Sequence, residues 1–169
     1  RGAAYSDTSN DQAVLDVIAY LGFSESSDLY HRLVIDTQLV DTLEPDNPDH
    51  VDPGLMVVLA RLKRAADIDA VRREILAAFE GFKRTPVARE RLDAVKSHFR
   101  YGFALGLDNS ESIAATLAHY IALRRTPETI NRLHELYAAV TPDDIMRVAN
   151  KYFVDRERVI VTLTGKDAR

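Results

Sequence analysis

The chain lacks cysteine and lacks any long apolar run. With no Cys among its 169 residues, disulfides and zinc sites built from thiolates are excluded. No apolar run approaches the roughly 20 residues that a membrane-spanning helix needs, and no signal-peptide pattern is visible. No low-complexity linker interrupts the chain, and 46% of its residues are hydrophobic. We therefore expect residues 1–169 to form a single domain with a packed core.

The sequence also lacks an initiating Met, because it opens on Arg1 followed by Gly2. This start predicts a piece of a longer polypeptide in which the first strand of the domain is clipped. We call that longer polypeptide the parent protein.

Basic residues are scarce at the start of the chain. Residues 1–60 hold eleven acidic and two basic residues, whereas residues 61–100 hold eleven basic and six acidic ones. The bases, such as Arg72, Arg73 and Arg89, alternate with acids such as Glu74 and Glu90. Interspersed signs favour solvated helix faces over a stripe that follows phosphates. We expect no nucleic-acid partner, and a helical nucleic-acid binder stays only as a third hypothesis.

Helical and strand patterns follow one another along the chain. Three segments read as strands, at residues 37–43, 55–62 and 158–165. The expected helix starts are Asn10 or Asp11 (with a stop at Gly22), Ser26 or Ser27, Asp67, Thr85-Pro86, Ser110 (running to Arg124), Thr126-Pro127 and Thr141-Pro142. Thr141 is the clearest of these, because its hydroxyl can cap a helix that carries Pro142 and two Asp residues in its first turn. The pattern predicts a two-layer α+β domain, with a mainly antiparallel sheet packed by helices on one face.

Catalytic and metal-binding motifs are missing. The histidines are His31, His50, His98, His119 and His134. No two of them have the spacing of a helical zinc site, and there is no His-x-x-Glu-His. For His98, His119 and His134 a half-buried imidazole bonded to backbone is a better explanation than ligation or acid–base work. Gly-x-Ser-x-Gly is also absent, and Gly102 and Gly106 fall inside a helical pattern rather than in a phosphate loop.

The loop at residues 46–52 is the one local cluster with ligand-like chemistry. It holds Asp46, Asn47, Asp49, His50 and Asp52. It lacks the ligand spacing and the distal Glu of a calcium loop. A solvated acidic turn is the favoured interpretation, and weak cation binding is the alternative.

Several motifs, taken in order, resemble the repeated domain of M16 metallopeptidases, a family that includes insulysin, pitrilysin and mitochondrial processing peptidase. The resemblance covers nearly the whole chain and resides in residues 11–18, Leu21-Gly22, residues 26–33, residues 91–96, residues 109–114 and residues 141–145. It implies a two-layer α+β unit that occurs in tandem, with two halves facing each other across a chamber for an extended peptide. Zinc and its general base belong to the half that carries His-x-x-Glu-His, which this chain does not have.

The resemblance also implies where the active partner half would carry its own functional residues. That half follows the Leu-Tyr-x-x-Leu element with an Arg and, seven residues later, a Tyr, which bind substrate and the developing oxyanion. Here the element is Leu29 to Leu33, and the two positions are Val34 and Asp41. Neither side chain can donate the required hydrogen bonds, and the nearby Tyr30 and Arg32 belong to the structural element itself.

These residues predict no catalytic, cofactor-binding or metal-binding residue in this chain. The expected function is that of a non-catalytic half, the C-terminal or inactive type, of a zinc metallopeptidase. It would form a chamber wall and dock a sister domain in the same parent protein or in a partner subunit, which would supply zinc. The alternative is a scaffold module whose parent protein has lost hydrolysis. The resemblance favours a bacterial periplasmic or secreted setting.

Overall fold

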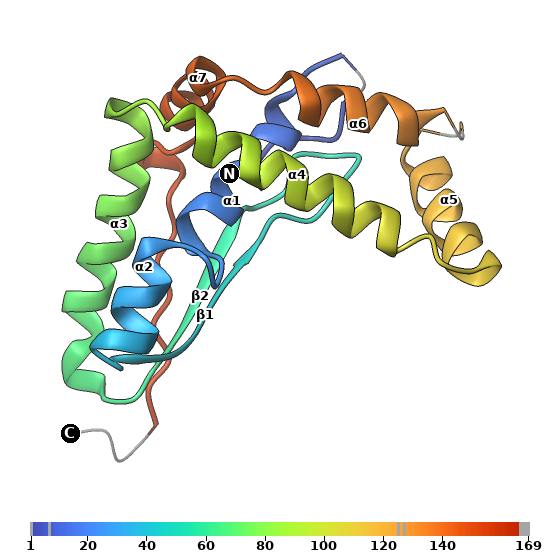
Figure 1. Cartoon of the computed structure of the whole chain (residues 1–169). Coiled ribbons are helices and arrows are strands. Elements are labelled where there is room, and N and C mark those ends of the chain that lie inside the picture. Colours follow the sequence, from blue (N-terminus) through green and yellow to red (C-terminus); the bar gives the residue numbers. More distant parts are fainter. Residues whose placement is uncertain (1, 7, 125, 127, 166–169) are drawn as a thin grey trace.

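A computed structural model of the chain describes residues 2–6, 8–124, 126 and 128–165 (Figure 1). The α-helices are α1 (Asp11–Phe23), α2 (Asp28–Tyr30), α3 (Ile68–Arg84), α4 (Arg89–Leu105), α5 (Ser110–Arg124), α6 (Thr129–Ala139) and α7 (Pro142–Tyr152). A π-helical turn η1 (His31–Asp36) continues α2, and two short 3₁₀ turns are η2 (Ala65–Asp67) and η3 (Asp155–Glu157). The strands are β1 (Val40–Asp46) and β2 (Val57–Leu62).

The sheet is antiparallel and has two strands among the described residues, so the fold is mixed α+β but richer in helix than the sequence pattern suggests. Strand β2 confirms the expected strand at 55–62. Strand β1 begins three residues later than expected, because η1 occupies the chain up to Asp36 and Gln38 turns it at a φ of 52°. The hairpin pairs Leu43 with Ala60 and Pro45 with Val58.

The expected strand at 158–165 is wrong for the structure as described. Arg158 has extended backbone, with φ −94° and ψ 133°, and the segment runs alongside β2 in Figure 1. Among the described residues, no strand pairs with this segment. The β-branched residues of the segment favour an extended chain, but a strand also needs a hydrogen-bonded neighbour.

Helix α1 lies at the centre of the molecule and joins two apolar clusters. Its Val14, Val17 and Ile18 are fully buried in a cluster with residues of α4, α6 and α7. Its last residue, Phe23, packs in a second cluster with β1, α2, η1 and α3. Gly22 does not end this helix as expected. It lies inside α1, where a Cβ would come within 2.9 Å of the Phe82 ring, so the glycine permits close packing of α3 on α1.

The helix starts test the capping expectations directly. Ser27 caps α2 by accepting from the Tyr30 amide at 3.1 Å, and Thr141 forms a capping box with Asp144. Helix α3 begins directly after Asp67, as expected, but the Asp67 carboxylate binds Arg64 and makes no cap hydrogen bond. The expected start at Thr85-Pro86 is wrong, because α4 begins at Arg89, three residues after Pro86. Helix α5 has the expected bounds, and Pro127 lies outside the described residues.

Candidate functional site

One face of the sheet is covered by helices and the other is open. Residues directly opposite each other in an antiparallel pair point to the same side. On the covered side, Val40 and Leu43 are buried and face the half-buried Leu62 and Ala60. The other side, which we call the open face, carries these pairs: Thr42 with Arg61, Glu44 with Leu59, and Asp46 with Val57. Leu59 is 58% exposed there, so apolar side chains on the open face have no cover among the described residues.

Val34 and Asp41 lie in different surroundings. Val34 lies on η1 and packs, half-buried, against the apolar cluster between the sheet and α3. Asp41 lies where the β1–β2 register shifts, and its carboxylate is 3.6 Å from the Arg61 guanidinium. An apolar group and a carboxylate offer no donor to an oxyanion, which is what the Arg and Tyr of an active partner half would supply.

The neighbouring Tyr30 and Arg32 are committed to the fold. Tyr30 packs against the same apolar cluster as Val34. Arg32 is paired with Glu74 of α3 at 2.7 Å. Their contacts fit the structural role expected of the Leu-Tyr-x-x-Leu element.

The loop at residues 46–52 is not fully solvated, because two of its side chains contact helices. The Asn47 side-chain amide donates to Asp16 of α1 at 2.7 Å. Asp49 lies 3.7 Å from the His119 imidazole of α5, and its side chain is only 20% exposed. Asp46, His50 and Asp52 are exposed, as expected of a turn.

Asp16, which accepts a hydrogen bond from Asn47 of this loop, has a strongly raised carboxyl pKa. Burial raises the pKa of the Asp16 carboxyl to about 7, although hydrogen bonds from Tyr137 and Asn47 favour its charged form, and the negative charge of Asp49 raises the pKa further. Burial, with the charge of Asp49, also raises the pKa of Tyr120 to about 12. The sequence motifs did not predict this cluster. The signal that could have shown it is Asp16 itself, the one charged residue within the apolar stretch of residues 13–23.

A second carboxylate, that of Asp11, joins helix α1 to helix α7. Asp11 of α1 accepts from Arg147 at 2.7 Å, from Lys151 at 2.6 Å and from the Tyr152 hydroxyl at 2.9 Å. Burial alone would raise the pKa of Asp11, but these hydrogen bonds outweigh it and lower the pKa to about 2. All three donors lie on α7, so this site holds α7 against α1.

The histidines differ from expectation in their surroundings. His98 and His119 are exposed, and His134 alone is half-buried. Each contacts aromatic rings: His98 lies 4.5 Å from Tyr20 between ring centroids, and His134 lies 4.1 Å from Phe103. Burial lowers the pKa of His134.

The residues that the structure describes do not form a site for a zinc ion. A protein zinc site needs at least three converging ligands. Within the described part of the chain, no three His, Asp or Glu side chains are grouped to hold a metal. In the same residues, no helix combines the length and the apolar character needed to cross a membrane.

No family model matches the chain. The chain is 26% identical over 154 residues to the zinc protease PqqE of Helicobacter pylori. The aligned region covers 90% of this chain and 34% of that protein. It therefore spans about a third of the length of this curated relative. A solved protease from Helicobacter pylori superposes with a TM-score of 0.80 at 24% identity, over 91% of this chain and 37% of that one.

A smaller solved structure matches nearly end to end. It is the inactive peptidase domain of a candidate zinc protease from Bordetella parapertussis, with a TM-score of 0.78, 25% identity, and coverage of 92% of this chain and 84% of that one. A candidate zinc protease from Bordetella pertussis Tohama I gives a TM-score of 0.76 at 24% identity, over 92% and 86% of the two chains. The chain has the fold of a zinc-protease peptidase-like domain.

Proposed function

We propose that this peptidase-like domain is the non-catalytic half of an M16-type zinc metallopeptidase. It forms one wall of a peptide chamber and docks a sister domain that holds zinc and carries out hydrolysis. The observation that carries the proposal is the end-to-end likeness to a domain described as the inactive peptidase domain of a candidate zinc protease. The chemistry of Val34 and Asp41, which offer no donor to a substrate, supports a role without catalysis.

The open face supports the role of a chamber wall. It is an uncovered sheet surface in which the apolar Val57 and Leu59 stand beside Glu44, Asp46 and Arg61. A surface of this kind can contact an extended peptide through apolar and charged groups at once. The helices on the opposite side leave this face as the one available to a sister domain.

Substitutions at the two key positions test the non-catalytic role in the parent protein. We expect Val34→Thr and Asp41→Asn each to leave kcat/KM for peptide hydrolysis within about twofold, because neither side chain contacts the reacting atoms. Val34→Thr keeps the shape of the side chain. Asp41→Asn removes only an exposed ion pair with Arg61, which contributes less than about 1 kcal/mol.

A loss of about a hundredfold in kcat/KM for either variant, with unchanged thermal unfolding, would show that these positions serve catalysis. A scaffold module is the alternative function. A parent protein that hydrolyses no peptide and has no His-x-x-Glu-His would favour it over the proposal.

A further inference from the structure

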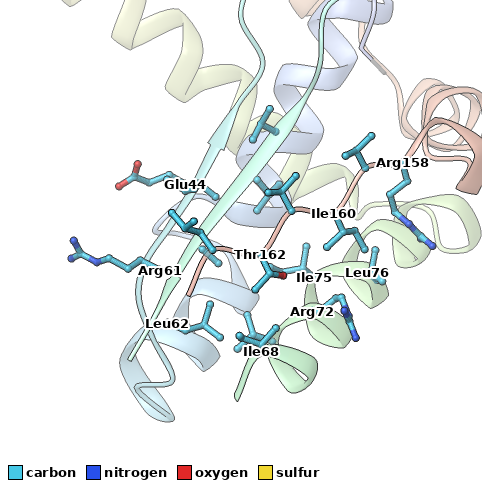
Figure 2. Close-up of a pocket in the computed structure, with 18 of the residues that line it drawn as sticks. Glu44, Arg61, Leu62, Ile68, Arg72, Ile75, Leu76, Arg158, Ile160 and Thr162 are labelled. Carbon is cyan, nitrogen blue, oxygen red and sulfur yellow. The ribbon is translucent and has the colours of Figure 1, made fainter. Parts of the chain in front are cut away.

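An elongated groove separates β2 from the extended segment at 158–165. Its volume is about 1060 Å³, and its floor is the apolar side of α3, including Ile68, Ile75 and Phe79. Figure 2 shows β2 on one side, α3 below and the segment that carries Ile160 and Thr162 on the other side. Because the groove is bounded by two extended chains, its shape suits another extended chain better than a compact ligand.

Both walls of the groove have backbone groups without a partner among the described residues. Of the strands in that part of the chain, β2 pairs with β1, along one edge. Pro45, which has no N–H, lies opposite Val58, so the backbone N–H and C=O of Val58 are expected to point to the free edge. On the other wall, the backbone of 159–165 makes no hydrogen bond among the described residues. A sheet edge left in this state is a ready template for another strand.

The walls also expose more apolar surface than an isolated domain would favour. Val161 is 85% exposed and Leu163 is 97% exposed, and Val57 and Leu59 are exposed on the opposite wall. Contiguous apolar surface of this kind usually marks a contact that the free domain does not make.

The first residues of the chain already begin a pairing that leads to this groove. The Gly2 amide donates to the Gly54 carbonyl at 2.9 Å, and the Tyr5 amide donates to the His50 carbonyl at 2.8 Å. As the chain advances from Gly2 to Tyr5, the acceptor moves backward from 54 to 50, which is the order of an antiparallel pair. Gly2 also lies beside Leu55 and Met56, immediately before β2. Continued upstream of Arg1, the same pairing would follow β2 toward Leu62.

The two walls fix the direction that a strand lying in the groove would take. Strand β2 ends at Leu62, close to the start of α3, and Figure 2 shows the segment passing from Arg158 through Ile160 to Thr162 toward the same end. The walls therefore run in parallel, and a strand antiparallel to β2 is antiparallel to both. Such a strand would join β1, β2 and 158–165 into one sheet over α3.

We infer that the groove binds a β-strand formed by the residues of the parent protein that immediately precede Arg1. About seven residues, at about 3.4 Å each, span β2 in this register. Alternate residues of this strand face α3 and should be apolar, since the floor is apolar. This inference does not depend on the proposed function, because a catalytic or a scaffold parent would need the same strand.

Hydrogen exchange of the backbone amides tests the inference. One variant extends the chain before Arg1 with seven residues that alternate Thr and Val. A matched control replaces the residues at alternate positions with Pro, which cannot donate to a sheet. We expect exchange in 57–62 and 158–165 to slow by roughly ten- to a hundredfold in the Thr/Val variant, and to be unchanged in the Pro control. The intact parent protein should show the same protection as the Thr/Val variant.

Three results would overturn the inference. One is fast exchange in both segments of the intact parent protein. Another is equal protection by the Thr/Val and Pro extensions. The third is protection in the unextended chain that rises with protein concentration together with a dimer in light scattering, which would assign the groove to a second copy.

Discussion

Replacing Asp16 with asparagine is expected to flatten the dependence of stability on pH. Burial raises the pKa of Asp16 to about 7 in the folded chain, whereas an unfolded Asp titrates near 3.9. Between these values the folded state keeps a proton that the unfolded state has lost, so the free energy of unfolding falls as pH rises from about 4 to about 7. The linked loss is about 2–4 kcal/mol. The side-chain amide that Asp16→Asn introduces cannot ionise, and it can still bond Tyr137 and Asn47.

Urea unfolding at pH 5, 6, 7 and 8 measures this effect. The Asp16→Asn variant should gain stability relative to the natural chain as pH rises. The matched control is Asp93→Asn, at an exposed position on α4, which should follow the natural chain. If the curves of the natural chain and of Asp16→Asn stay parallel over this range, Asp16 does not hold a proton in the folded state.

Replacing Asp11 with alanine is expected to lower the free energy of unfolding by about 2–3 kcal/mol at pH 7. The substitution removes the shared acceptor of Arg147, Lys151 and Tyr152 and so weakens the contact of α7 with α1. The two cationic side chains are half-exposed and regain water, which keeps the loss moderate.

The effect of Asp11→Ala should depend on pH. The pKa of Asp11 is lowered to about 2, so its contribution is fully present above about pH 4 and is lost as pH falls toward 2. The difference between the natural chain and Asp11→Ala should therefore shrink on acidification. Asp143→Ala, which removes an exposed carboxylate from the first turn of α7, is the control. A similar loss for both variants at pH 7 would show that helix-end charge, rather than the shared acceptor, explains the effect.

Local signals in the sequence predicted part of this fold well. Ser27 and Thr141 cap helices as their side chains and positions suggest, because a cap depends on residues within one turn. The same rule failed at Asp67, whose carboxylate has a closer partner in Arg64. Capping patterns thus predict where a helix can start, while competing ion pairs decide whether the cap forms.

Long-range features were beyond the sequence pattern. The segment at 158–165 has the residues of a strand, but strand formation depends on a neighbour that the described residues do not provide. The raised pKa of Asp16 arises in surroundings that include Asn47 and Tyr137, which lie 31 and 121 residues away. By contrast, the absence of donors at Val34 and Asp41 follows directly from residue type.

Zinc content, measured together with peptide hydrolysis, tests the central claim most directly. The 169-residue chain and the intact parent protein are purified alike, dialysed against a weak chelator, and analysed for zinc per polypeptide and for cleavage of an unstructured peptide. We expect stoichiometric zinc and hydrolysis in the parent protein, and neither in the shorter chain. Tight stoichiometric zinc in the shorter chain, with cleavage that a strong chelator abolishes, would contradict the claim.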